Sequence, residues 1–362
     1  MTISQAPAAP KEWIDALKGI GIVAVVMGHA YGWRDGSILP LIYLFHMPLF
    51  FFLSGYLYKP SPDLLVFLRK KTFHLLVPYA AFLLLIVLIP DVYRAIAIHD
   101  FGITEAKYSL KNAIYGGRRL EGAATAFWFV PCLFLTQQIF NFIVVRSRRG
   151  GLLLIILAAT VVSYVNSLLY QHARLPLNVN VVLGALPLFY LGYVFKRHEN
   201  RRWITLAAFA VSILAVALVR SGMPNFYDMK VADYGIPVVT MASAIAVTIA
   251  LIAVAKQLER VSVVSHGFVA LGQASMVIMF VHQAVFLMRA ELGSNNRVYG
   301  IVLAIAVSYL VYLLAKRFTI SRAVLLGSEA DFKKLLKPRG ARGTADQSDI
   351  TTSPPPTRSG LR

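Results

Sequence analysis

The sequence has one cysteine and few charged residues for its length. Cys132 has no second cysteine to pair with, and no cluster of cysteine and histidine has the spacing of zinc ligands. We therefore set aside a disulfide framework, a redox site and a structural metal. Asp, Glu, Lys and Arg together make up 15% of the 362 residues, whereas soluble domains contain about a quarter. This shortage of charge excludes an ordinary soluble domain.

Apolar residues dominate the chain instead. Hydrophobic residues account for 57% of it, and the mean hydropathy is +0.64. Runs of about 17 to 25 apolar residues can cross a bilayer as helices, and about ten such runs can be identified. The sequence therefore predicts an all-α polytopic membrane protein with about ten transmembrane helices in one bundle. The predicted spans are Ile14–Tyr31, Leu39–Leu57, Phe73–Ile89, Ala123–Val145, Leu152–Leu169, Val179–Phe195, Trp203–Val219, Tyr234–Ala255, Phe268–Leu287 and Val298–Ala315.

Acidic residues are scarce as well. The chain has 17 Asp and Glu against 36 Lys and Arg, a formal net charge of +19. The basic residues fall between the apolar runs and not on one amphipathic face, which indicates membrane orientation and no nucleic-acid partner. About two thirds of them fall on the side that carries both termini. We therefore expect an integral protein of the bacterial inner (plasma) membrane, in contact with its lipids, with both termini cytoplasmic.

Three regions follow from this pattern. Residues 1–12 are a polar cytoplasmic segment that lacks the basic region and cleavage site of a signal peptide. Residues 13–316 form the transmembrane domain. Residues 317–362 are a basic cytoplasmic tail, whose Pro, Ser, Thr and Gly content predicts disorder from about residue 337. Any chemistry must therefore lie in the helical bundle or its loops.

The first apolar run carries ionisable residues on one helix face. Lys18 and His29 are eleven residues apart, about 20° from three full helical turns, so they share a stripe with Asp15, Ile22 and Val25. Lys18 could equally be an interface anchor that extends toward water, and a histidine near a span end could be interfacial. An ionisable group inside the membrane is nevertheless a functional-site hypothesis.

Two further runs repeat this feature. In the second run His46, Phe50 and Ser54 recur every four residues, and His46 lies at a depth comparable with His29. In the ninth run Ser275 and His282 are seven residues apart, near one face. These histidines could simply form interhelical hydrogen bonds. At similar depth, however, they predict a polar cavity that opens outward.

The fourth run is less decisive. Trp128 and Gln137 lie in the segment AFWFVPCLFLTQQ. A tryptophan near a span end is usually an interface anchor. Trp128 therefore has two interpretations: it anchors the span at the membrane interface, or it contacts a ligand.

The order of these motifs resembles the acyltransferase 3 family of integral membrane acyltransferases. Lys18 and His29 are separated by ten residues, and FHMPLFFFLSGYLY, RKKTFHLLVPY, FWFV and LGQASMVIMFVH follow in order. The similarity covers most of residues 13–315. The segments WIDALKGIGIVAVVMGHA and FHMPLFFFLSGYLY most resemble the fucose 4-O-acetylase-like branch, which acetylates sugars.

The resemblance implies a membrane-bound O-acetyltransferase. Its acyl donor would be acetyl-CoA, and its acceptor a hydroxyl of a cell-surface saccharide or lipid-linked oligosaccharide. The histidine of the family's R/K-x10-H motif, thought to be catalytic, matches His29, and its basic residue matches Lys18. Where the family often has Arg-x-x-Arg before Pro-Tyr, this sequence has Lys71 and His74.

The chemistry agrees with these roles. A sugar hydroxyl needs a base to remove its proton before it attacks a thioester, and an imidazole has a suitable pKa, so His29 is the candidate general base. We expect His46 and His282 to share the catalytic site, and Lys18, Trp128 and a cluster of Arg69, Lys70 and Lys71 to bind CoA, the cluster through its phosphates. Acceptor-binding candidates are Asp15, Ser54 and Ser275; His46, Ser54 or Ser275 could also stabilise the oxyanion.

Several alternatives stay open at this level. The basic cluster is also explained by retention of positive charge on the cytoplasmic side. The acetyl group could move directly to the sugar or pause on a side chain such as a histidine. A secondary transporter or a flippase for a small polar or sugar substrate would also have many spans and buried polar groups, although no pair of related halves is visible in the sequence.

Overall fold

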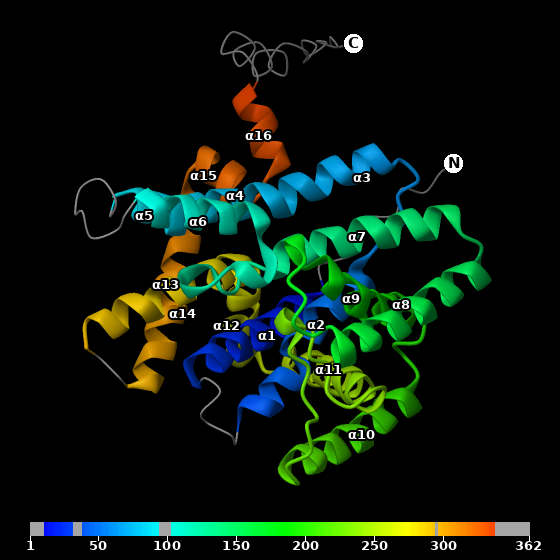
Figure 1. The fold of residues 1–362 in the computed structure, drawn as a ribbon. Coiled ribbons are helices and arrows are strands. Elements are labelled where there is room, and N and C mark those ends of the chain that lie inside the picture. Colours follow the sequence, from blue (N-terminus) through cyan, green and yellow to red (C-terminus); the bar gives the residue numbers. More distant parts are fainter. Residues whose placement is uncertain (1–10, 32–37, 94–102, 294–295, 337–362) are drawn as a thin grey trace, which may run out of the picture.

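The computed structural model describes residues 11–31, 38–93, 103–293 and 296–336. Within these ranges the chain is helical and contains no β-strand (Figure 1). Short 3₁₀ turns interrupt the loops at residues 117–119, 122–124, 176–178 and 229–231. The helices are α1 (Glu12–Tyr31), α2 (Leu39–Leu57), α3 (Leu64–Lys71), α4 (Val77–Leu83), α5 (Ile89–Tyr93), α6 (Ile103–Tyr115), α7 (Phe129–Arg146), α8 (Arg149–Leu169), α9 (Val179–Phe195), α10 (Arg202–Arg220), α11 (Val239–Leu258), α12 (Ser262–Gln273), α13 (Ser275–Glu291), α14 (Arg297–Arg317), α15 (Thr319–Leu325) and α16 (Glu329–Leu336).

The described helices confirm the predicted polytopic membrane fold. Nine segments in the described ranges are long and apolar enough to cross a membrane, or ten if the bent pair α12 and α13 is one span. We call the face where α1 and α3 begin and α2 and α7 end the N-terminal face, and the other the opposite face.

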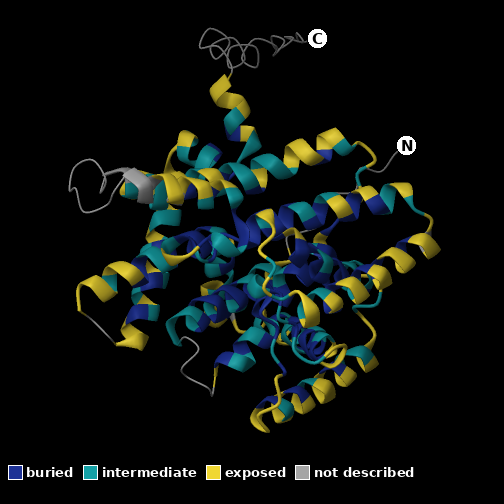
Figure 2. Ribbon diagram, viewed as in Figure 1, coloured by how far each residue is buried: buried dark blue, intermediate teal, exposed yellow. Residues whose placement is uncertain are grey.

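The core lies around α1, α2, α7 and α9. Figure 2 shows buried residues concentrated there and exposed residues on α3, α8 and α10. Helices α2 and α9 touch backbone to backbone, because a Cβ on Gly55 would collide with the carbonyl of Phe189, and one on Gly192 with that of Phe52. This close packing fixes the position of α2 against α9.

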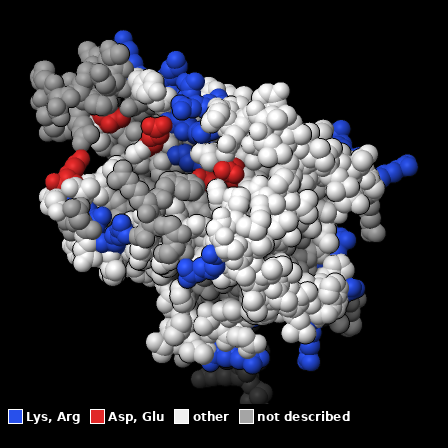
Figure 3. Space-filling view, turned by 60° about the horizontal axis from the view of Figure 1, so that its bottom comes forward, with Lys and Arg blue, Asp and Glu red and all other residues white. Residues whose placement is uncertain are grey.

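The outer helices carry apolar side chains that the protein does not cover. Leu154 and Leu168 on α8 are 69% and 66% exposed, and Ile213 on α10 is 73% exposed. Figure 3 shows a broad uncharged face with most Lys and Arg side chains near its margins. Since apolar residues that face outward are stable in lipid, these helices have the surface of a membrane-spanning bundle.

The predicted span Phe268–Leu287 is wrong as a single straight helix. The chain bends by 77° between α12 and α13, with Ala274 as the junction. Gly272 packs against the backbone of Asp15, and Gly19 against that of Phe268, so α12 is held tightly to α1. The weak helix propensity of glycine favours a break at this position.

The predicted span Tyr234–Ala255 begins too early. Helix α11 starts at Val239, and residues 234–238 belong to the preceding loop. Gly235 has a positive φ of 57° and Pro237 follows it, a combination that does not continue a helix. Tyr234 is fully buried and stacks on Tyr227 with ring centroids 4.8 Å apart, which folds this loop back onto the bundle.

The third span is longer than the predicted Phe73–Ile89. Its helices form one apolar segment from Leu64 to Asp91, with π-helical turns at Thr72–Leu76 and Leu84–Leu88. Pro78 has no N–H to donate to the carbonyl of His74 four residues earlier, and a wider turn before it accommodates the missing bond.

Residues 317–336 continue past the last span as two short helices. The ring of Phe332 in α16 lies 4.9 Å from that of Phe73, centroid to centroid, and Arg322 pairs with Asp331 at 3.0 Å. Figure 1 shows α15 and α16 above α4, on the side away from α10 and α11. The expected disorder from residue 337 concerns residues outside the described ranges.

Candidate active site

A cavity of about 1180 Å³ runs through the centre of the bundle. Helices α1, α2, α3, α7 and α13 contribute most of its lining, together with loops at both faces. Lys59 and Lys70 at one end and Glu121 and Arg174 at the other are both lining and exposed at the surface, whereas His46 between them is buried. The cavity therefore extends between the N-terminal face and the opposite face.

Both helical stripes predicted from spacing line this cavity. On α1 these residues are Lys18, Ile22, Val25 and His29; on α2 they are His46, Phe50 and Ser54. The stripes run side by side, so Lys18 and Ser54 lie nearer the N-terminal face and the histidines nearer the opposite face. Of the three histidines predicted to share a polar cavity, His29 and His46 line this one.

The three histidines form one cluster. The rings of His29 and His282 are 5.2 Å apart between centroids, and His46 lines the same cavity as His29. His282 Nδ1 donates to the Ile278 carbonyl at 2.8 Å, and His46 Nδ1 to the Ile42 carbonyl at 2.9 Å. Because a carbonyl can only accept, each neutral ring keeps its lone pair on Nε2.

This tautomer limits what His46 can do. A neutral His46 accepts a hydrogen bond at Nε2 and cannot donate one there. The expectation that it donates to an oxyanion therefore does not fit its hydrogen bond to Ile42. The lone pair on Nε2 suits His46 to accept a proton.

Lysines and a histidine surround the end of the cavity near the N-terminal face. We call this group the basic mouth. No carboxylate belongs to the described lining at this end, although Lys18 pairs with Asp15 at 2.9 Å just outside it. Both positions that replace the family's Arg-x-x-Arg lie here. The basic mouth consists of Lys18, Lys59, Lys70, Lys71 and His74.

The other end of the cavity carries both signs of charge. Its side chains come from the loops before α7, before α9 and before α11. We call it the mixed-charge mouth. It consists of Arg118, Glu121, Arg174, Asp228 and Lys230.

Asp228 and Lys230 dominate the electrostatics of the mixed-charge mouth. Burial raises the pKa of Asp228 to about 6, although the Lys230 ammonium acts in the opposite direction. Burial also lowers the pKa of Lys230 to about 8, opposed by the Asp228 and Glu121 carboxylates. Lys230 Nζ donates to the Leu120 carbonyl and to Thr125 Oγ1, each at 2.7 Å. These bonds fix the loop of Asp228 against the cavity.

Three predicted site residues do not line the cavity. Arg69 is exposed, with its Nε 3.9 Å from Glu329 Oε1, so its charge lies outside the basic mouth. The Asp15 carboxylate lies beside the site, where it pairs with Lys18. His282 is fully buried behind His29 and has an unpartnered Nε2 among the described residues. It can act only through His29.

Ser54 and Ser275 line the cavity away from the histidines. Ser54 is eight residues after His46, and Ser275 seven before His282, which corresponds to about 12 and 10 Å along the helix axes. A hydroxyl at that depth does not reach a thioester held beside His29. The expected oxyanion role of both serines therefore does not fit their positions.

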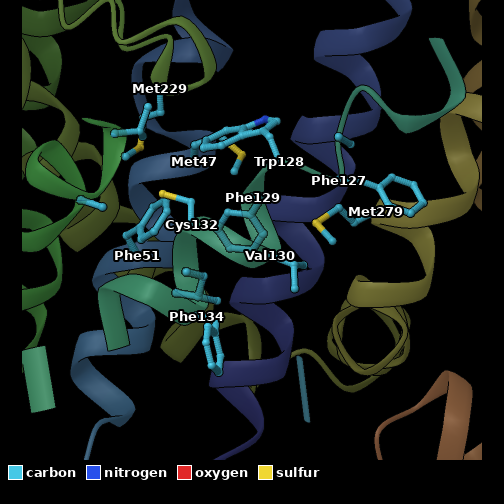
Figure 4. Packing of buried hydrophobic residues seen from close by; sticks show 14 of the residues in the cluster. Met47, Phe51, Phe127, Trp128, Phe129, Val130, Cys132, Phe134, Met229 and Met279 are labelled. Atoms are coloured by element: carbon cyan, nitrogen blue, oxygen red, sulfur yellow. The ribbon is translucent and has the colours of Figure 1, made fainter. Parts of the chain in front are cut away.

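Trp128 lies at the level of the histidines. Figure 4 shows its ring next to Met47, the neighbour of His46, with Met229 on the far side of Met47. It is far from the basic mouth along α7, which begins at the opposite face. Of a donor that enters through the basic mouth, Trp128 can contact only the acyl end.

The sequence analysis missed the residues of the mixed-charge mouth. Asp228 and Lys230 lie in YDMKVADYG, a polar segment inside the loop between two apolar runs. A carboxylate and a lysine two residues apart in a loop near Pro and Gly were a usable signal, because functional residues often lie on loops held by a rigid scaffold.

No group of three or more His, Cys, Asp or Glu residues that could hold a metal ion occurs in the part of the chain that the structure describes.

Comparison with known families identifies the family of the chain. A family model described as "Acyltransferase domain", that of acyltransferase 3, matches residues 11–316. The chain belongs to the acyltransferase 3 family. The matched range contains every residue that lines the cavity except Leu326. Searches of the curated proteins and of the solved structures found no match. The protein is thus a membrane acyltransferase by family, and its donor and acceptor have to be argued from the cavity.

Proposed function

We propose that this protein transfers an acetyl group from acetyl-CoA to a hydroxyl of a cell-surface or lipid-linked saccharide, as in the fucose 4-O-acetylase-like branch. One observation supports the proposal above all others. A single cavity joins a purely basic mouth to a mixed-charge mouth and has His29 and His46 between them.

The basic mouth suits the nucleotide end of CoA. Its four lysines can neutralise the phosphates, and the cavity behind them has a volume of about 1180 Å³ in which the arm can lie. Lys71 and His74 both line this mouth, so the departure from Arg-x-x-Arg keeps nitrogen donors at both positions. Lys18 lies deeper on α1, where it can guide the arm toward His29.

The mixed-charge mouth suits a saccharide. Sugars present many hydroxyl groups, which both donate and accept hydrogen bonds. Asp228 and Glu121 can accept from them, and Arg118 and Arg174 can donate to them. Trp128 and Met47 offer an apolar surface beside these groups. A few placed polar groups on an apolar wall are typical of small-molecule sites.

In the proposed reaction His29 acts as general base. It takes the proton of the acceptor hydroxyl while that oxygen attacks the thioester carbonyl carbon. The new O–C bond forms, the C–S bond breaks, and the CoA thiolate leaves with the proton from the His29 imidazolium. The products are the acetyl ester and CoA thiol, and His29 is neutral again. Because both mouths reach His29, the acetyl group needs no stop on the protein.

The other groups near His29 assist this transfer. The third Nζ hydrogen of Lys230 is available to the negative oxygen of the transition state, since two already bind Leu120 and Thr125. The free Nε2 of His46 provides a second proton acceptor on the cavity wall. Ser54 and Ser275 are then left to contact the substrates farther down the cavity.

His282 is proposed as a positioning residue. Its Nδ1 bond to Ile278 fixes its ring against His29. His282→Phe should lower kcat about tenfold, leave both KM values unchanged and shift the pH at which kcat is half-maximal. A change in the KM values without a change in the pH profile would indicate general damage to the site.

The proposed orientation places the N-terminal face in the cytoplasm of a bacterial inner membrane. CoA is a cytosolic metabolite, and the basic mouth would open to its compartment. A cysteine introduced at Glu121 should react with a membrane-impermeant thiol reagent in whole cells, with buried Cys132 silent. Labelling only after lysis would contradict this orientation.

The decisive experiment measures acetyl transfer by the purified protein. Labelled acetyl-CoA and surface glycan should give an alkali-labile acetylated glycan, and His29→Ala should reduce the rate at least about a hundredfold. His266→Ala is the matched control, because His266 is exposed on α12 and does not line the cavity. Wild-type protein that forms no acetylated glycan would overturn the proposal, as would full activity in His29→Ala.

A further inference from the structure

Ser54 and Gln137 form a polar pair halfway along the cavity. Ser54 lies on α2 and Gln137 on α7, and both line the cavity wall. Gln137 Nε2 donates to Ser54 Oγ at 2.7 Å. Gln137 is only 6% exposed, so the pair lies inside the protein and not at a lipid-facing surface.

Each member of the pair keeps one unused hydrogen-bonding group. Gln137 Oε1 is buried and has no partner among the described residues. Ser54 Oγ accepts from Gln137, which leaves its own hydrogen to donate. The pair thus presents at least one acceptor, Gln137 Oε1, and one donor, the Ser54 hydroxyl.

Stability alone does not explain this arrangement. A buried polar atom without a partner costs about 1 to 3 kcal/mol. A leucine at position 137 would pack against the apolar lining at no such cost. The unpaired Oε1 therefore indicates a partner that binds in the cavity.

The position of the pair identifies the kind of partner. Ser54 is eight residues after His46 on α2, about 12 Å along the helix axis, and Lys59 of the basic mouth follows the end of α2 at Leu57. If the phosphates of CoA bind at the basic mouth and its thioester at His29, the pantetheine arm passes this pair. The arm has two secondary amides, each with one N–H and one C=O.

We propose that Ser54 and Gln137 bind the pantetheine arm of the acyl-CoA donor, an inference that rests on the proposed function. Gln137 Oε1 accepts an amide N–H, and the Ser54 hydroxyl donates to an amide C=O. In a trans amide the N–H and C=O point in opposite directions, so the two contacts come from different amides of the arm. The pair selects donors that carry this arm.

The test compares two ligands that share the nucleotide end. CoA carries the arm, and adenosine 3′-phosphate 5′-diphosphate lacks it. For Gln137→Met, the Kd of CoA should rise about tenfold by calorimetry, and for Ser54→Ala about threefold, as expected for the loss of one hydrogen bond. The Kd of the truncated nucleotide should stay unchanged, which also shows that each variant keeps a folded basic mouth.

Thr136→Val is the matched control. Thr136 precedes Gln137 on α7, is fully buried, donates to the Cys132 carbonyl of its own helix and does not line the cavity. It should bind both ligands as the wild type does. If Gln137→Met binds CoA as tightly as the wild type does, the inference is overturned and the proposed function stays intact. The same holds if the variant raises the Kd of CoA and of the truncated nucleotide by the same factor. Wild-type protein that binds no CoA overturns both.

Discussion

The two mouths of the cavity differ in the sign of their charges and in how they are built. The basic mouth takes its charge from helices α1 and α3 and the turns next to α3, and its described lining has lysines without carboxylates. The mixed-charge mouth is built from loops, and both carboxylates of the described lining, Glu121 and Asp228, lie there. One end thus suits a polyanion, and the other suits a neutral molecule with many hydroxyls.

The difference shows how one cavity can receive two substrates from two sides. Charges on helices near a face lie at fixed depths and give a broad positive field. Charges on loops can be placed individually and matched to single hydroxyls. The kinetic effect of a mutation should therefore depend on the mouth that it changes.

The largest effect is expected from reversal of charge in the basic mouth. Lys70→Glu with Lys71→Glu should raise the KM for acetyl-CoA roughly a hundredfold, because two attractions to phosphate become repulsions. The KM for the acceptor should stay unchanged. Steady-state kinetics with each substrate varied in turn measures both values.

A double reversal on the same face provides the control for this variant. Arg201→Glu with Arg202→Glu changes the same number of exposed charges outside the cavity lining. It should leave both KM values near those of the wild type. If it matches the variant of the basic mouth, the effect comes from the net charge of the face.

A smaller effect is expected at the mixed-charge mouth. Asp228→Asn should raise the KM for the acceptor roughly tenfold, because hydroxyls donate more strongly to a carboxylate than to an amide. The KM for acetyl-CoA should not change. An increase in the donor KM alone would reverse the assignment of the two mouths.

Salt should affect the two substrates differently. Raising the ionic strength from about 0.05 to 0.5 M should increase the KM for acetyl-CoA several-fold, because exposed charges are screened at high salt. The acceptor KM should change little. In the variant with Glu at positions 70 and 71, salt should no longer raise the KM for acetyl-CoA. If salt raises that KM as much as in the wild type, the donor binds elsewhere.

The smallest effect is a dependence of stability on pH. Asp228 has a pKa of about 6 in the folded protein and 3.8 as its ordinary value, so its ionisation costs folding free energy as pH rises through this range. Asp228→Asn should therefore match the wild type below pH 3.8 and melt a few degrees higher above pH 6. Differential scanning fluorimetry in nanodiscs measures the difference. If the melting temperature of the wild type instead rises relative to that of the variant over this pH range, an ion pair stabilises the Asp228 carboxylate.

The sequence predicted much of the helical part of the site. Lys18 and His29 share a face because eleven residues nearly complete three turns, and His46 and Ser54 share one for a similar reason. Such spacing is local, and no neighbouring element can change it. The basic mouth followed from the same logic, except Arg69, whose side chain points toward α16.

The residues that the sequence did not identify depend on packing between distant segments. Gln137 meets Ser54 across 83 positions, and Lys230 meets Thr125 across 105. The partner of His29, His282, could be listed as a candidate but could not be paired with it. Its contact with His29 depends on the 77° bend that aims α13 at α1.

The sequence by itself determined the membrane fold, the approximate spans and the stripes of polar residues along α1 and α2, because hydropathy and helical periodicity act over short distances. Only the tertiary structure decided that the stripes face one cavity, that a loop with Asp228 and Lys230 lines its far end, and that His282 lies behind the cavity wall. These features arise where helices and loops pack against one another, and the position of a loop between two spans is set by its contacts and not by its own composition.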